Sequence, residues 1–243
     1  MKKNVYETIC KNLIHCIQNV LKTNTMQSFS VSAKGSDDLV TTIDVAFEEH
    51  IINQLKALYP NIDILSEETH FTQPKPNTYF TIDPLDGTVN FANHLPLYGI
   101  QLAFVEKGIT QVAVVYLIPT QEMYYAIRGK GAFCNNQKIS VTTQPAKNTL
   151  VFIDGNNQQI FANFAPKLTN DFLRVRIIGA SCVEFTSIAS GNAGGLLLIA
   201  KTPWDYIQGC LLVTEAGGYI EQHDDVFICG ATQEIVHAIK KYV

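Results

Sequence analysis

Hydrophobic residues recur along the first part of the chain with two different spacings, which predict helices and then strands. Between residues 5 and 21, apolar side chains return every three or four positions, the pattern of one face of an amphipathic helix. The same spacing follows Asp44 as far as Leu58 and predicts a second helix. Short apolar runs at 62–65 and 79–83 then predict the first strands.

The middle of the chain consists of longer apolar runs separated by turn residues. The runs cover residues 98–106, 110–118 and 122–127, and turns at 106–108 and 119–121 connect them. Connections this short join neighbouring strands that run in opposite directions, so we expect these three strands to be antiparallel.

Beyond about residue 145, strand-like and helix-like segments alternate. The predicted order is strand 150–153, helix 158–168, strand 173–178, helix 181–190, strand 195–200, helix 204–216, strand 226–229 and a helix from Thr232. Such alternation predicts an α/β arrangement built on a second sheet. We therefore expect one domain, 1–243, with an N-terminal α+β half at 1–145 and a C-terminal α/β half at 146–243.

Length and composition describe a globular chain without a basic surface. The chain has 243 residues, of which 47% are hydrophobic and 16% are charged, and its formal net charge is −4. This composition excludes a disordered chain, and the negative charge argues against nucleic-acid or membrane partners. The six cysteines form no C-x-x-C pair, and polar residues interrupt the first apolar segment, so no export signal is visible. We therefore expect a reduced, cytoplasmic protein.

One short stretch in the first half carries the strongest candidate chemistry. An apolar run ends at Asp83, Pro84 restricts the next backbone dihedral, and Asp86 adds a second carboxylate. Gly87 permits a left-handed backbone, and Thr88 can open a helix whose first N–H groups bind an anion. A rigid turn with two acids beside such donors suits a hard metal cation and a phosphate ester. Taken alone, the same residues also fit an ordinary Pro-x-Asp-Gly turn.

Four separated motifs, taken in order, resemble those of the inositol monophosphatase family. They lie at residues 38–44, 67–68, 83–91 and 204–205, and further family-like stretches lie at 128–133 and 214–218. The resemblance implies an α/β (α+β) fold, the layered α-β-α-β-α sandwich of the inositol monophosphatase / fructose-1,6-bisphosphatase type. It also implies a phosphoric monoester hydrolase that uses magnesium-activated water and forms a homodimer.

The same resemblance implies that carboxylates bind two or three magnesium ions. Glu67, Asp83 and the carbonyl of Leu85 would hold one ion, and Asp83, Asp86 and Asp205 a second, with a weaker third ion near Glu67. Oxygen ligands of this kind are those that magnesium prefers. Considered individually, Glu67 could be a solvated loop acid and Asp205 a helix N-cap.

The resemblance assigns water activation to Thr88 and Asp44, with Glu67 as a further catalytic residue. The hydroxyl group of Thr88 would accept a proton from the water if its own proton were directed onto Asp44. Alternatively, Thr88 is a plain helix N-cap and Asp44 an exposed helix residue. The implied substrate-binding residues are Asp86, Gly87, Thr88, Ala180, Ser181 and Asp205.

Substrate choice is where the chain departs from the family. Members that prefer inositol phosphates place an acid before the Trp-Asp pair, where this chain has Leu198. Leucine accepts no hydrogen bond from a hydroxyl group, so we expect a broad range of small phosphorylated metabolites. NADP, fructose 1,6-bisphosphate and nucleoside 3′,5′-bisphosphates are alternative substrates, and a regulatory binding protein of RNA metabolism is an alternative role. We expect Lys34, just before the first motif, to be solvated.

Overall fold

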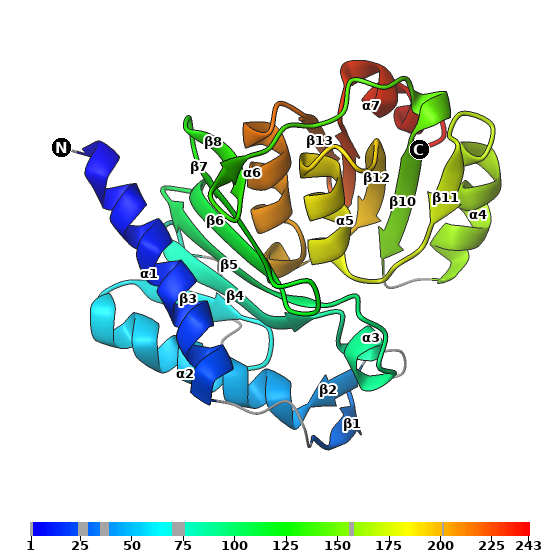
Figure 1. Ribbon diagram of the computed structural model, residues 1–243. Helices are drawn as coiled ribbons and strands as arrows, with labels where there is room; N and C mark the ends of the chain where they lie inside the picture. The colour runs from blue at the N-terminus through cyan, green and yellow to red at the C-terminus, as the bar shows by residue number, and fades with distance from the viewer. Residues whose placement is uncertain (1, 24–28, 35–38, 70–75, 156–157, 201) are drawn as a thin grey trace.

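Two β-sheets alternate with three layers of helices in the computed structural model (Figure 1). The structure describes residues 2–23, 29–34, 39–69, 76–155, 158–200 and 202–243. Helices α1 (Lys2–Thr23) and α2 (Thr42–Leu58) cover the first sheet, α5 (Ser181–Ala189) and α6 (Ile207–Glu215) lie between the sheets, and α4 (Gln158–Leu168) and α7 (Gln233–Lys240) cover the second. The expected layered α-β-α-β-α sandwich is therefore confirmed.

The first sheet has seven strands and follows the chain order. Its strands are β3 (Asp63–Ser66), β4 (Tyr79–Asp86), β5 (Gly99–Glu106), β6 (Ile109–Leu117), β7 (Glu122–Ile127), β8 (Gly131–Cys134) and β9 (Gln137–Lys138). β3 is parallel to β4, and all later neighbours are antiparallel. The predicted hairpins are confirmed, whereas the short strands β8 and β9 carry too little apolar pattern to have been predicted.

The outer face of this sheet is buried by the two amphipathic helices that the sequence predicts. The apolar stripe of α1 is almost fully buried, with Leu13 and Ile17 both 0% exposed. It packs with Phe47 of α2 and Phe80 of β4 in one continuous core. Each such side chain contributes about 1.5–3 kcal/mol when it is removed from water, so this packing fixes α2 against the sheet. A small hairpin of β1 (Val31–Ala33) and β2 (Leu39–Thr41) leads into α2.

The second sheet has five strands in the order β11-β10-β12-β14-β13. Their bounds are β10 (Leu150–Gly155), β11 (Arg174–Arg176), β12 (Gly195–Ile199), β13 (Tyr219–His223) and β14 (Val226–Gly230). β10 is parallel to β11 and to β12, as expected for an α/β half. β13 was not predicted, because this edge strand is mostly polar and solvent-facing and has no apolar alternation.

The middle layer of helices joins the two sheets through a shared core. Phe185 of α5 and Leu212 of α6 are fully buried, and they pack with Val115 of the first sheet and Leu196 of the second. The connecting pieces are α3 (Thr88–Ala92) and the 3₁₀ helices η1 (Ala146–Asn148) and η2 (Pro203–Asp205). The helix predicted at 204–216 therefore begins as a 3₁₀ turn, and its α-helical part begins at Ile207.

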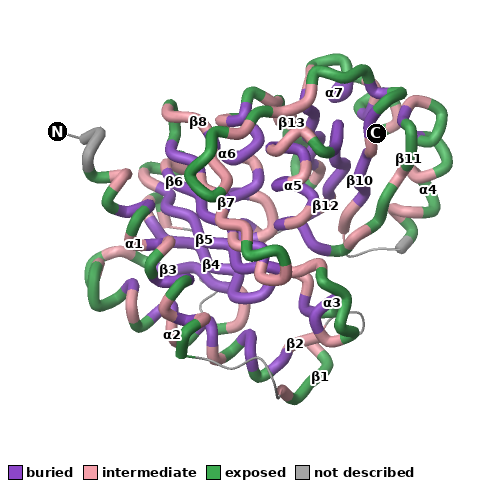
Figure 2. Tube along the Cα trace, viewed as in Figure 1, coloured by how far each residue is buried: buried purple, intermediate pink, exposed green. Residues whose placement is uncertain are grey.

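Burial is greatest along the sheets and the middle helices, as Figure 2 shows in purple. Exposed positions concentrate on the outer helices and on the turns. Within the described ranges, every helix is too short or too polar to cross a membrane. All six cysteines are free thiols.

The contact between α5 and α6 depends on the absence of a side chain at Gly209. A Cβ atom at Gly209 would lie 2.1 Å from Cγ of the buried Phe185. Alanine normally favours a helix by about 1 kcal/mol over glycine, but overpacking a core costs about 1–3 kcal/mol. We therefore expect Gly209→Ala to lower the free energy of unfolding, measured by urea denaturation.

The matched control is Thr214→Ala, an exposed position on the same helix. We expect this change to alter the free energy of unfolding by less than about 0.5 kcal/mol. If Gly209→Ala were as stable as the wild type, the close packing of α5 on α6 would be wrong.

Candidate active site

The site is built around an irregularity at the end of β4. Asp83 pairs with Gln101 of β5, and Asp86 pairs with Gly99, so the register shifts between the two acids. Pro84 lies in this bulge, where the missing N–H of proline costs no ladder hydrogen bond. The Leu85 N–H donates to Oδ1 of Asp83 (3.1 Å). The strand therefore delivers two carboxylates to one edge of the first sheet.

Gly87 makes the turn into α3 in a left-handed conformation, with φ of +87°. A Cβ atom there would lie 2.6 Å from the Leu97 carbonyl oxygen and 3.1 Å from Cβ of Ala180. Both the positive φ and the close approach require glycine at this position. The turn consequently packs tightly against the residue that precedes α5.

Asp44 links the start of α2 to the hydroxyl group of Thr88. Oδ2 of Asp44 accepts the Thr41 N–H (2.8 Å) and the Thr41 hydroxyl, completing a capping box at the start of α2. Oδ1 lies 2.9 Å from the Thr88 Oγ1, which is also 2.9 Å from the Leu85 carbonyl oxygen. The Thr88 proton thus points at one of two buried acceptors, and Oγ1 retains lone pairs to accept another proton.

The two alternative readings of this pair are wrong. Asp44 is 1% exposed, so it is not a solvated helix residue. The N-cap of α3 is Gly87, and Thr88 is the first residue of the helix. Burial raises the pKa of Asp44, and its hydrogen bonds to Thr41 and Thr88 oppose that shift.

Asp86 connects the first sheet to the first turn of α5. Its Oδ2 accepts the side-chain amide of Gln101 (3.0 Å), the hydroxyl of Ser181 (3.0 Å) and the backbone N–H of Cys182. Gln101 also lies 2.9 Å from the Ser181 hydroxyl. Burial raises the pKa of Asp86, although the hydrogen bonds from Ser181 and Cys182 act against it. Sequence reasoning missed Gln101, because a single glutamine inside an apolar strand carries no recognisable signal.

A second amide, Asn90, holds α3 against the loop before α5. Its Nδ2 donates to the carbonyl oxygens of Leu97 and Ile178, both at 3.0 Å. These bonds fix the position of Ala180, which is 1% exposed, relative to Gly87. The predicted substrate-binding residues from both halves of the chain therefore adjoin each other.

Glu67 lies directly after β3, where Lys34 holds it. The Lys34 ammonium group contacts Oε1 of Glu67 at 2.9 Å and Oε1 of Glu68 at 2.8 Å. The expectation that Lys34 is solvated was wrong, because the β1–β2 hairpin places it beside two carboxylates. Their charges raise the pKa of Lys34 even though burial alone would lower it. The buried Glu48 orders the same loop by accepting the Glu68 N–H at 2.8 Å.

Asp205 does not cap a helix, contrary to the simplest reading of the sequence. The N-cap of α6 is Tyr206, which makes no side-chain capping bond. Oδ2 of Asp205 instead accepts the hydroxyl of Thr202. The carboxylate belongs to η2, between the middle helices and the end of β4.

The four proposed ligand carboxylates lie close enough to perturb one another. Asp83 is 2% exposed, and its pKa is raised first by burial and then by Glu67, Asp86, Asp205 and Asp44. The pKa of Asp205 is raised to about 8, mainly by burial and further by Asp86 and Glu67. Gathering like charges in a buried site is costly unless a cation compensates them.

The donor set fits magnesium in its chemistry, because it consists of hard carboxylate and carbonyl oxygens. The side chains are not already arranged as a ligand shell: within the described residues, no three His, Cys, Asp or Glu side chains are placed to hold an ion. Glu67 is paired with Lys34, and Asp205 with Thr202. Metal binding would therefore require these two carboxylates to exchange partners. Asp38, the first residue of its motif, lies outside the described residues.

A cavity of about 320 Å³ is separate from this site. It is lined by residues of α6, of β13 and β14, and of the ends of strands in the first sheet, including Tyr79, Arg128 and Phe227. None of the four proposed ligand carboxylates lines it.

Comparisons with known proteins agree on the family. The model of the inositol monophosphatase family matches residues 1–240. The chain is 34% identical over 203 residues to Nus factor SuhB of Escherichia coli (strain K12), covering 81% of this chain and 76% of that protein. It is 31% identical over 186 residues to the fructose-1,6-bisphosphatase/inositol-1-monophosphatase of Thermotoga maritima, covering 76% and 72%. The solved structure of a Thermotoga maritima IMPase matches with a TM-score of 0.82 at 25% identity, covering 100% of this chain and 98% of that one.

The raised pKa of Asp205 predicts how the metal-free protein responds to pH. An unfolded aspartate titrates near pH 3.9, whereas this one titrates near pH 8 when folded. Between these values the folded state binds the extra proton, so stability falls as the pH rises. We expect the free energy of unfolding in EDTA to be lower at pH 8 than at pH 5. In Asp205→Asn, urea denaturation should show a smaller difference between the two pH values; an unchanged difference would contradict this assignment.

Proposed function

The chain belongs to the inositol monophosphatase family, and on this premise we propose that it hydrolyses small phosphate monoesters with the help of magnesium ions. The observation that carries the proposal is the gathering of Glu67, Asp83, Asp86 and Asp205 beside the hydrogen-bonded pair of Thr88 and Asp44. These residues come from separate segments of the chain, and no structural role of a turn or cap accounts for the whole set.

We assign the metal ligands as the family resemblance implies. Glu67, Asp83 and the Leu85 carbonyl would hold one magnesium ion, Asp83, Asp86 and Asp205 a second, and a third would lie near Glu67. Bound magnesium would lower the pKa of a water molecule and neutralise the phosphoryl oxygens. Asp83, at the edge of the bulge, would be the ligand that the two ions share.

Thr88 and Asp44 provide a path for the proton of the attacking water. Oγ1 of Thr88 accepts that proton and passes its own to Oδ1 of Asp44, 2.9 Å away. Burial favours the protonated form of Asp44, which suits a group that must accept a proton. The water oxygen bonds to phosphorus as the ester bond breaks, and the products are an alcohol and inorganic phosphate.

The phosphate would lie between the two halves of the chain. Backbone N–H groups at Gly87 and Thr88 face this position in the proposal, with Ala180 and Ser181 at the start of α5 on the other side. The close approach of Gly87 to Ala180 supports a single site made by both turns. Homodimer formation and a cytoplasmic location stay predictions from the sequence.

A regulatory role is the second candidate function. It is favoured by one observation, the 34% identity to a relative named as a Nus factor. The negative net charge provides no general attraction to nucleic acid, so a partner of this chain would have to recognise a local surface. Fructose 1,6-bisphosphate, NADP and nucleoside 3′,5′-bisphosphates stay alternative substrates for the same site.

We expect magnesium-dependent release of phosphate without a covalent phosphoenzyme. EDTA should abolish phosphate release from small esters, and added magnesium should restore it. Because water attacks phosphorus directly, a single turnover in ¹⁸O-labelled water should place one labelled oxygen in the phosphate. A protein residue that became phosphorylated during turnover would overturn this mechanism, and the lack of any phosphate release would favour the regulatory role.

We expect Asp83→Asn and Thr88→Ala to separate metal binding from proton transfer. Asp83→Asn removes charge from the shared ligand, so it should weaken magnesium binding and nearly abolish kcat. Thr88→Ala removes the proton path but no carboxylate, so it should keep magnesium affinity and lose about 10²–10⁴-fold in kcat. Calorimetric magnesium titration and steady-state kinetics measure both effects. Wild-type kcat in both variants at saturating magnesium would refute the site.

A further inference from the structure

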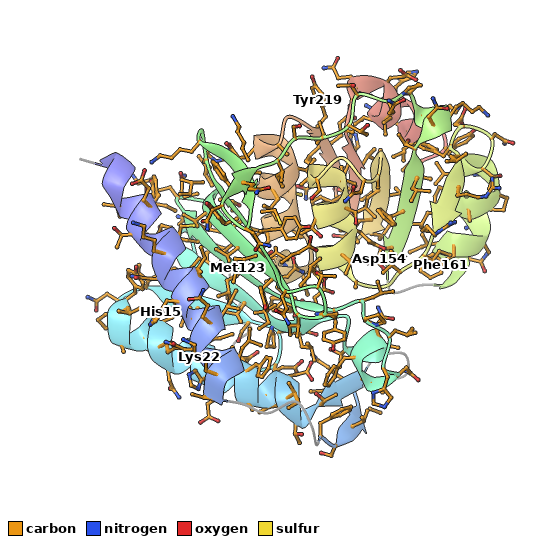
Figure 3. The ribbon with its side chains drawn as sticks, in the orientation of Figure 1. His15, Lys22, Met123, Asp154, Phe161 and Tyr219 are labelled. Carbon is orange, nitrogen blue, oxygen red and sulfur yellow. The ribbon has the colours of Figure 1, made fainter. Side chains whose placement is uncertain are left out.

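Two acids that have no part in the proposed mechanism, Asp154 and Glu184, lie near Asp86. Asp154 is the penultimate residue of β10, and Glu184 lies in the first turn of α5. Figure 3 shows Asp154 at the end of β10, beside α5. The two carboxylates interact with each other, and the charge of Asp86 acts on both. This pair therefore adjoins the proposed site without belonging to its metal ligands.

The register of the second sheet sets the direction of the Asp154 side chain. β10 and β12 are parallel, with Asp154 opposite Leu198 and Phe152 opposite Leu196. Paired residues of neighbouring strands share one face of a sheet. Leu198, Leu196 and Phe152 all lie in the core shared with α5 and α6. Asp154 therefore projects toward the middle layer, at the strand end where open α/β sheets bind their ligands.

Glu184 is in an unusual environment for a charged residue. It is 0% exposed, and among the described residues no donor of good geometry serves its carboxylate oxygens, whereas the carboxyl group of Asp154 lies beside it. Burial and the neighbouring Asp154 raise its pKa well above the ordinary value, which favours the protonated form of this carboxyl group. Unsatisfied buried carboxyl groups are costly, which points to a functional reason for this one.

Asp154, in contrast, is partly exposed to solvent, and its carboxylate can accept a hydrogen bond. One carboxylate oxygen accepts the Gly155 N–H at 2.7 Å, and the residue is only half-buried. Burial raises the pKa of Asp154 to about 6, below neutral pH. Of the two groups, Glu184 has the environment that more strongly favours a proton, and Asp154 the one that more readily keeps a negative charge.

We propose that Asp154 accepts a hydrogen bond from a hydroxyl group of the substrate's alcohol portion, and that Glu184 positions Asp154 from the buried side. This inference rests on the proposed phosphatase function and specifies its substrate class, a phosphate ester of a polyhydroxylated alcohol such as a sugar or cyclitol. It revises the expectation from Leu198 that this part of the site lacks an acid. The negative charge of Asp154 also repels a second phosphate group, which disfavours bisphosphate substrates.

The wild-type protein tests the substrate class directly. Myo-inositol 1-phosphate and cyclohexyl phosphate have the same ring and the same ester, but cyclohexyl phosphate has no hydroxyl groups. We expect kcat/KM in magnesium to be about 10- to 100-fold higher for the inositol ester, the size of effect that one hydrogen bond to a charged group gives. Equal values for the two esters would overturn the inference while leaving the phosphatase function in place.

Variants then assign the preference to Asp154. Asp154→Ala should lose the 10- to 100-fold preference by lowering kcat/KM for the inositol ester, with kcat/KM for cyclohexyl phosphate unchanged. Asp63→Ala, which removes an exposed acid at the start of β3, is the matched control and should change neither value. An equal loss on both esters, or no loss on either, would overturn the role of Asp154. If Asp154→Ala does not fold, Asp154→Asn provides the same comparison through a smaller loss.

Glu184 is tested as a positioning residue by two substitutions. Glu184→Gln keeps a neutral hydrogen-bond donor and should retain the preference for the inositol ester. Glu184→Leu removes the donor and should lose most of it, mainly through KM. If both variants behaved alike on both esters, Glu184 would have no positioning role. Failure of the wild type to release phosphate from either ester would overturn the phosphatase function and this inference with it.

Discussion

The site depends on one electrostatic constraint, the placement of several carboxylates in a buried region where each disfavours the charge of the others. The negative charge of Asp83 is strongly disfavoured, because this residue is buried and the other acids surround it. Such a cluster persists only if the backbone that carries it cannot relax. Three features restrict the backbone here. They are the bulge at Pro84, the pairing of β4 with both β3 and β5, and the capping box of α2. The same repulsion creates the demand for cations that a magnesium-dependent phosphatase uses.

A second consequence is that the candidate site lies where the end of β4 meets the start of α5. Asp86 belongs to the first sheet, yet its hydrogen-bond donors include Ser181 and the backbone of Cys182 in the middle layer. Asn90 ties the same turn to the loop that precedes α5. Glycine at position 87 lets these segments approach closely. Packing of α5 and α6 between the sheets is therefore a requirement for the chemistry as well as for stability.

The charge distribution also separates two parts of the proposed substrate site. The acids around Asp83 would attract metal ions and, through them, the phosphate. Asp154, at the end of β10 and beside Glu184, would in the proposal accept a hydrogen bond from a neutral polyol. Lys34 occupies the first region by pairing with Glu67 and Glu68, so a metal ion that bound Glu67 would compete with this lysine for the same charge.

The sequence by itself determined the local features of this protein. The periodicity of α1 and of the strands from β4 to β7 follows from which side chains must leave water, and Pro84 and Gly87 restrict their own backbones. The four motifs also identified the candidate site. Only the tertiary structure decided that the polar segment at β13 is a strand, because pairing with β14 is what makes it one. It likewise decided that Lys34 meets Glu67, that Gln101 meets Asp86 and that Asp154 meets Glu184. Such contacts depend on strand register and on the packing of layers. These bring together residues that are far apart in the sequence, so the sequence alone does not show that they are in contact.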